Sequence, residues 1–162
     1  MSQQIDDQYI LTPDGHKKLL ELLEHLKKDH REEIRERMQN AEKSSIVSED
    51  PEFEEIKKDQ AMLESRIAHL EGILKKSKVL SPQEISTDRV GIGSRVKVKN
   101  LKTKNEEEYT ILSSMETNPA ENKISDASPV GRALMRAKKG DIVQPETPRG
   151  RVRYLILNIK KS

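Results

Sequence analysis

The sequence predicts an α+β protein in which an N-terminal antiparallel helical hairpin is followed by a β-rich domain. Apolar residues follow a helical spacing between residues 13 and 74, and the pattern changes to strand-like alternation after Ser81-Pro82. Only 33% of the chain is hydrophobic and 2% aromatic, while 36% is charged, which suits an elongated helical part that buries a single stripe. We expect domains at residues 1–80 and 81–162.

The first helix is predicted from residue 13 to about residue 43. Thr12 can cap it, and Pro13 suits the first helical position because its missing N–H is not needed there. No proline or glycine interrupts residues 16–50. A stripe that is strong near the start and thinner afterwards follows: Leu19, Leu22, Leu23, Leu26, His30, Ile34, Met38 and Ala41.

The second helix is predicted to start at Asp50-Pro51, again a capping residue before a first-turn proline. Its seam positions alternate in spacing between three and four residues: Phe53, Ile56, Gln60, Leu63, Ile67, Leu70 and Leu74. This is a coiled-coil seam in which Gln60 is the polar interruption that sets the register. The short connection favours an antiparallel pair within one chain, although a homodimeric coil stays open.

The turn between the two helices, at about residues 44–52, is the first candidate functional site. It places the exposed apolar residues Ile46 and Val47 beside the carboxylates Glu49 and Asp50. Carboxylates at a helix N-terminus usually only stabilise that helix, which explains Asp50. Glu49 lies outside the helix and is harder to explain in this way.

Residues 81–162 predict a small β-rich domain with one helix. Strands are expected at 95–99, 108–111, 141–143 and 152–159, with a turn at Pro148-Arg149-Gly150. Ser128 and Pro129 begin the expected helix. The last strand is apolar on both faces, with Ile156 on one and Ile159 on the other, which is typical of a central strand.

Charge is unevenly distributed along the chain. Residues 1–80 carry 14 Lys and Arg against 18 Asp and Glu, a net charge of −4, and residues 81–162 carry 16 against 10, a net charge of +6. The basic residues of the second half cluster at Arg132, Arg136, Lys138, Lys139, Arg149, Arg151, Arg153, Lys160 and Lys161. They indicate an acidic partner surface or nucleic acid nearby, or simply a solvated face.

Several classes of function are disfavoured. The chain has no cysteine, no Gly-rich phosphate loop and no histidine pair at i, i+4, so neither a zinc site nor self-contained catalysis is expected. No apolar run approaches the length of a membrane span, and the N-terminus has no signal-like segment. We expect a cytoplasmic monomer without an intrinsic cofactor.

Five segments together resemble the motifs of the Gre-type transcript cleavage factors of bacteria over nearly the whole chain. They are Ile10-Leu11-Thr12-Pro13-Asp14-Gly15, the leucine spacing after it, and the segments 66–74, 90–96 and 128–134. The resemblance implies an FKBP-like second domain that docks on RNA polymerase at the rim of its secondary channel. It also implies a coiled coil that reaches toward the polymerase active site. The polymerase would cleave any RNA, so the factor would be an accessory and not an enzyme.

The resemblance also implies roles for particular residues. Glu49, with Asp50 as a substitute ligand, would help hold a Mg²⁺ shared with the polymerase. Lys43 and Lys57 would face the nascent RNA 3′ end. The residues implied to dock on the polymerase are Ser128, Pro129, Gly131 and Arg132.

Some residues depart from the family pattern. Ile46 stands where the family carries an aspartate of the acidic tip pair, and Arg136-Ala137 replaces a Gly-Lys. Isoleucine cannot ligate a metal ion. We therefore expect a transcription elongation factor-like protein that modulates paused or backtracked polymerase with weak or no stimulation of transcript cleavage.

Other functions remain as alternatives. A true cleavage factor is one, and a coiled-coil adaptor or chaperone unrelated to transcription is another. Prolyl isomerisation is disfavoured because residues 90–162 offer only Tyr109 and Tyr154 as aromatic lining. Direct DNA binding by the basic face is weakly signalled, since no groove-reading motif is present.

Overall fold

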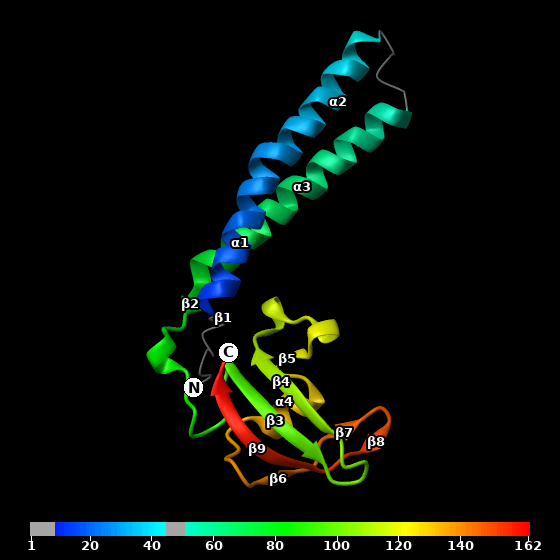
Figure 1. The fold of residues 1–162 in the computed structure, drawn as a ribbon. Coiled ribbons are helices and arrows are strands. Elements are labelled where there is room, and N and C mark those ends of the chain that lie inside the picture. Colours follow the sequence, from blue (N-terminus) through cyan, green and yellow to red (C-terminus); the bar gives the residue numbers. More distant parts are fainter. Residues whose placement is uncertain (1–8, 45–50) are drawn as a thin grey trace, which may run out of the picture. The chain divides into compact units, whose positions relative to one another are not determined.

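The structure is a computed structural model that describes residues 9–44 and 51–162. The chain divides into two compact units, one of residues His16–Ser77 and one of Lys78–Ser162 together with Met1–Gly15. A helical hairpin precedes a curled β-sheet with one short helix, which confirms the predicted α+β class (Figure 1). Within the described ranges, no helix combines the length and apolar character that crossing a membrane requires.

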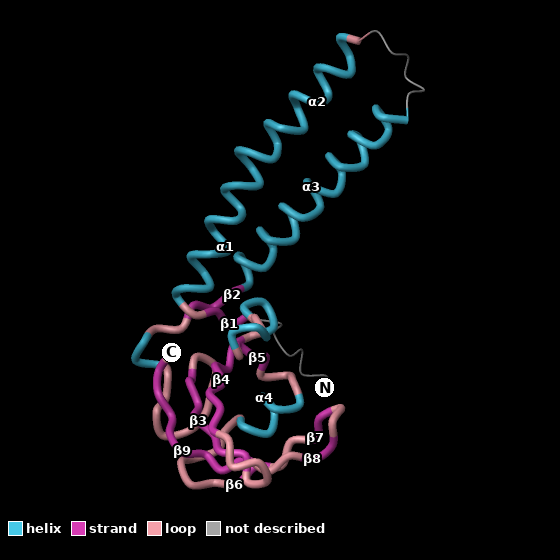
Figure 2. Tube along the Cα trace, turned by 45° about the vertical axis from the view of Figure 1, so that its right-hand side comes forward, coloured by secondary structure: helices cyan, strands magenta, loops and turns pink. Residues whose placement is uncertain are grey.

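The hairpin contains both predicted helices. The first comprises α1 (Pro13–His25), a π-helical turn (Leu26–His30) and α2 (Arg31–Lys43), and the second is α3 (Pro51–Lys76). The two helices run alongside each other in both views (Figures 1 and 2). Their buried seam consists of Leu23, Leu26, Ile34, Ile56, Leu63, Ile67 and Leu70.

The π-helical turn keeps the first helix in phase with the seam. Leu26 and Ile34 are both buried, with 2% and 4% of their surface exposed, although they lie eight residues apart. Eight residues of α-helix overshoot two full turns by about 80°. The π-helical turn, whose hydrogen bonds join residues i and i+5, contains one more residue than an α-helical turn. It offsets this rotation, so Leu26 and Ile34 both face the second helix. His30, which the sequence placed in the stripe, is exposed instead.

The heptad prediction for the second helix is confirmed at most of its positions but is wrong at Gln60. Ile56, Leu63, Ile67 and Leu70 are buried, whereas Gln60 is exposed. Because Gln60 is exposed, it cannot set the register from within the seam.

The second unit contains one five-stranded sheet in the order β5-β4-β3-β9-β6. Its strands are β3 (Ser94–Asn100), β4 (Glu106–Leu112), β5 (Lys123–Ser125), β6 (Ile142–Val143) and β9 (Tyr154–Lys161). Only the β4–β5 pair is parallel. Two further small sheets pair β1 (Tyr9–Leu11) with β2 (Ser77–Val79), and β7 (Glu146–Thr147) with β8 (Gly150–Arg151). The four predicted strands and the predicted turn before Arg151 are therefore present.

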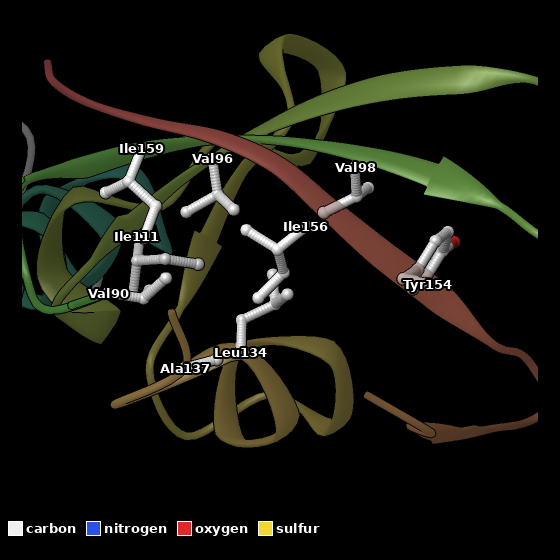
Figure 3. Close-up of a cluster of buried hydrophobic side chains, with 9 residues drawn as sticks. All are labelled: Val90, Val96, Val98, Ile111, Leu134, Ala137, Tyr154, Ile156 and Ile159. Carbon is white, nitrogen blue, oxygen red and sulfur yellow. The ribbon is translucent and has the colours of Figure 1, made fainter. Parts of the chain in front are cut away.

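Helix α4 (Pro129–Leu134) packs on the inner face of this sheet, where the core lies. Figure 3 shows Leu134 directed toward Ile156, and Ala137 belongs to the same buried cluster. β9 lies between β3 and β6, as its two apolar faces predicted. A register shift between Lys97 and Val98 inserts one residue into the β3–β9 ladder. Ile159 consequently shares the inner face with Ile156, and its predicted placement on the other face is wrong.

The start of α1 is held by a carboxylate from a distant part of the chain. Glu116 accepts hydrogen bonds from the Thr12 backbone N–H at 2.9 Å and from the Thr12 hydroxyl at 2.5 Å. The Thr12 hydroxyl in turn accepts from the Gly15 N–H at 3.1 Å, which confirms the predicted cap. An added Cβ at Gly15 would lie 1.7 Å from a Glu116 carboxylate oxygen, so a larger residue would displace the carboxylate that Thr12 binds.

The burial pattern of α3 predicts a contrast between two neighbouring substitutions. Ile56→Ala should lower the free energy of unfolding by about 2–4 kcal/mol, because Ile56 is 1% exposed and a cavity would remain. Gln60→Ala should change it by less than about 0.5 kcal/mol, because Gln60 is exposed. Urea unfolding followed by circular dichroism measures both, and a large loss for Gln60→Ala would restore Gln60 to the seam.

Candidate functional site

The acidic turn itself lies outside the described residues, which include neither Ile46 and Val47 nor Glu49 and Asp50. The structure places the helix ends on either side of it: α2 ends at Lys43, and α3 begins at Pro51. The sequence hypothesis for the turn therefore stays a prediction.

The two lysines assigned to RNA contacts occupy different settings. Lys43 is the last residue of α2 and is exposed. Lys57 is exposed near the start of α3, with its Nζ 3.4 Å from a Glu54 carboxylate oxygen and 4.6 Å from the centroid of the Phe53 ring. An ammonium over an aromatic face gains a modest attraction at an exposed site. The Lys57 ammonium is thus already paired with Glu54 and packed on the ring of Phe53, both on its own helix.

Ion pairs across the hairpin join its two helices in a single register. The Arg31 guanidinium donates two hydrogen bonds, both at 2.7 Å, to the Glu64 carboxylate. Arg37 pairs with Asp59 at 2.9 Å, and Lys27 pairs with Glu71. The bond from Arg31 lowers the pKa of Glu64. Partner positions on α3 fall as positions on the first helix rise, which confirms the predicted antiparallel pairing.

The predicted docking segment forms a sharply capped helix. The Ser128 hydroxyl accepts from the Gly131 N–H at 3.0 Å and donates to the Ser125 carbonyl at 2.6 Å. Gly131 is buried, and an added Cβ would lie 1.9 Å from the Ser125 carbonyl oxygen. Leu134, with no exposed surface, anchors the other end of α4 in the core. The segment Ser128–Leu134 therefore determines where α4 packs as well as where it begins.

The predicted docking segment exposes Pro129 and Arg132 to solvent, one helical turn apart. Arg136 lies two residues after the end of the helix and is also exposed. Its backbone has a φ of 65°, in the left-handed region that glycine adopts freely and other L-residues avoid at a cost of about 1–2 kcal/mol. Arginine here replaces the glycine expected from the family pattern.

Two tyrosines and one carboxylate form a polar cluster on the inner face of the sheet. Glu107 accepts from the Tyr109 hydroxyl at 2.7 Å and from the Tyr154 hydroxyl at 3.0 Å. The rings pack edge to face with centroids 6.1 Å apart. Burial is the main cause that raises the pKa of both tyrosines, and the adjacent Glu107 carboxylate adds to it. Both hydroxyls are committed to this internal cluster, so neither supports an isomerase site.

Sequence reasoning did not single out Glu107, and it named Arg136 as a basic residue and a departure from the family pattern without its left-handed backbone. Glu107 and Tyr109 are two residues apart in a strand, a spacing that places both on one face and could have revealed the pair. The backbone of Arg136 depends on contacts made after α4 and has no local signal. Across the part of the chain that the structure describes, no cluster of three or more potential metal ligands is present.

Both parts of the chain match family models. Residues 9–79 match a model described as the N-terminal domain of transcription elongation factors, and residues 85–161 match the C-terminal model of the transcription elongation factors GreA and GreB.

Full-length relatives agree with these matches. A protein named transcription elongation factor GreA from Thermoanaerobacter pseudethanolicus is 46% identical over 94% of this chain and 97% of its own length. A GreA from Clostridium acetobutylicum is 44% identical over 99% of this chain and its entire length. Among solved structures, the GreA factor homolog 1 of Thermus thermophilus is 30% identical, covers 94% of this chain and 99% of its own, and has a TM-score of 0.44.

The close approach at Gly131 predicts a strongly position-dependent effect of an added methyl group. Gly131→Ala should lower the free energy of unfolding by about 2 kcal/mol, because the methyl meets backbone and not a movable side chain. Gly91→Ala is the control, since no atom lies within 4 Å of its added Cβ. Thermal unfolding of both variants measures the difference, and equal stability would contradict the assigned packing of α4.

The tyrosine cluster predicts a loss of stability at alkaline pH. A raised pKa in the folded state means that the neutral tyrosines stabilise the fold fully below pH 10, where they also stay neutral in the unfolded chain. That contribution should fall as the pH rises above about 10, the ordinary tyrosine value. Urea unfolding at pH 8 to 11 should show a steeper loss for the wild type than for Tyr109→Phe, whereas parallel curves would contradict this origin.

Proposed function

The chain belongs to the GreA/GreB family of transcription elongation factors, and we propose that it acts by binding bacterial RNA polymerase and inserting its helical hairpin into the secondary channel. In this proposal it modulates paused or backtracked complexes as an accessory factor. The polymerase, which holds the main metal ligands, performs any RNA cleavage.

The construction of the hairpin supports this role. Its 26-residue second helix spans about 39 Å at 1.5 Å per residue, long enough to act as a probe. The buried seam and the three cross-helix ion pairs hold the two helices in one register. Two helices held in this way lose little conformational freedom on binding.

The capped helix α4 supports a docking role for the other unit. Pro129 and Arg132 are exposed on a helix whose backbone is fixed by Ser128 and by the close approach at Gly131. The remaining docking candidates, Ser128 and Gly131, therefore act by positioning the exposed pair.

The residues of the turn determine the effect of the hairpin once it reaches the polymerase active site. Ile46 offers no ligand atom at the position of the family's aspartate, so a Mg²⁺ shared with the polymerase would find Glu49 as the one tip ligand at a matching position. We therefore favour a modulator or inhibitor with weak or no stimulation of cleavage. The retained Glu49 and the adjacent Asp50 are the observation that keeps a true cleavage factor as the second candidate.

A polymerase stalled in a backtracked complex tests the two candidates directly. The wild type should release short 3′ RNA fragments no more than slightly faster than polymerase alone. Ile46→Asp should raise the cleavage rate by about tenfold or more, because it adds the missing carboxylate to a two-metal site. Gel analysis of end-labelled RNA measures both rates.

Matched variants separate ligation from a general effect of charge. Ser45→Asp adds the same charge one residue away and should leave cleavage unchanged. Fast cleavage by the wild type that Glu49→Ala abolishes would establish the second candidate in place of the first. Absence of wild-type binding to the polymerase, measured in parallel, would reject both and favour an adaptor outside transcription.

A further inference from the structure

Five exposed cations gather beside α4 from two separate chain segments. This basic cluster consists of Arg89, Arg132, Arg136, Lys138 and Lys139. Backbone hydrogen bonds hold its two segments together, from the Val90 N–H to the Ala137 carbonyl at 2.9 Å and from the Arg136 N–H to the Val90 carbonyl at 2.8 Å. A β-bridge pairs Arg89 with Lys138. The cluster is therefore a fixed feature of the fold.

The positive charge of this cluster is not neutralised within the described part of the chain. None of its five side chains forms an ion pair with another described residue, whereas elsewhere in the same unit Arg95 pairs with Glu108 and Lys97 pairs with Glu106. The neighbouring Asp141 carboxylate accepts from the Lys138 backbone N–H at 2.9 Å, so it caps a turn. The cluster thus presents a local excess of positive charge.

Arg136 is the member whose presence most needs an explanation. Its φ of 65° is a conformation that a glycine would adopt without strain. Its exposed side chain makes no interaction with described residues that would offset the unfavourable backbone. A strained residue maintained by its surroundings points to a functional constraint, and in this case the exposed group is a guanidinium.

The surroundings of the cluster favour a protein partner over nucleic acid. Pro129 is exposed one turn before Arg132, and Ile142 is 49% exposed three residues after Lys139. Arginine mixed with exposed apolar groups is typical of protein interfaces. Single-stranded nucleic acid instead needs aromatic stacking platforms, and the two tyrosines of the five-stranded sheet, Tyr109 and Tyr154, are hydrogen-bonded to Glu107 on its inner face.

We propose that the basic cluster is a docking surface for an acidic protein surface of RNA polymerase, and that Arg136 forms a charge-assisted pair with a carboxylate there. This inference rests on the proposed function and extends the docking site beyond Ser128–Arg132. The planar guanidinium matches a carboxylate with two parallel hydrogen bonds. Arg89 and Lys138 raise the rate of encounter through their charge.

The test measures binding of fluorescently labelled full-length protein to core RNA polymerase at several salt concentrations. Arg136→Gly should weaken binding by about tenfold at low salt, with a smaller difference at high salt. Its thermal midpoint should equal or exceed that of the wild type, because glycine relieves the positive φ. Arg136→Lys should retain part of the affinity, since it keeps the charge without the fork.

Lys104→Gly is the matched control, because Lys104 has a φ of 66° in the β3–β4 turn. It removes a cation from the same kind of backbone but not from the basic cluster, and its binding should stay within about twofold of the wild type. An equal loss for Lys104→Gly would replace a specific docking surface by a general charge effect.

The outcomes separate this inference from the proposed function. If the wild type does not bind polymerase, both fall. If the wild type binds and Arg136→Gly binds equally well with the same salt dependence, only the basic cluster inference is overturned. If Arg136→Gly loses affinity for an RNA or DNA duplex and not for polymerase, nucleic acid replaces the acidic protein surface as the partner.

Discussion

The hairpin depends on keeping a narrow apolar seam in phase along the whole first helix. The seam is about one side chain wide, so a rotation of 80° would place a residue such as Ile34 in solvent. The π-helical turn at Leu26–His30 prevents that rotation by absorbing one residue between Leu26 and Ile34. The cross-helix ion pairs, such as Arg31 with Glu64, form between helices that this alignment holds side by side.

Much of this fold could be predicted from the sequence, because the main signals are local. A first-turn proline after a capping residue located the start of each helix, and alternation located the strand around Val96 and Val98. The exposed state of Gln60 was not predictable in this way. A heptad template gives Gln60 the same seam position as Phe53 and Ile67, but how far a side chain at that position is covered depends on the partner helix.

The bulge in the sheet is the strand counterpart of that π turn. One additional residue between Ile156 and Ile159 brings both side chains to the core, although strict alternation would separate them. Each irregularity depends on the fit between two elements and not on a local pattern. For the candidate site, the same distinction holds. Ser128 and Gly131 are visible in the sequence as a capping motif, but the left-handed backbone of Arg136 arises from its bond to Val90.

The two units use their charges differently, and this difference bears on how each one would meet a partner. In the hairpin, cations such as Arg31 pair with carboxylates on the opposite helix, so the charges favour one register of the two helices. In the other unit, the cations around α4 project from backbone fixed by Ser128 and Leu134. A six-residue helix has little stability of its own, so its rigidity comes from the cap and the core. A positively charged surface on a rigid backbone loses little conformational freedom on docking. The attraction between opposite charges then contributes to affinity and sets the orientation of the bound partner.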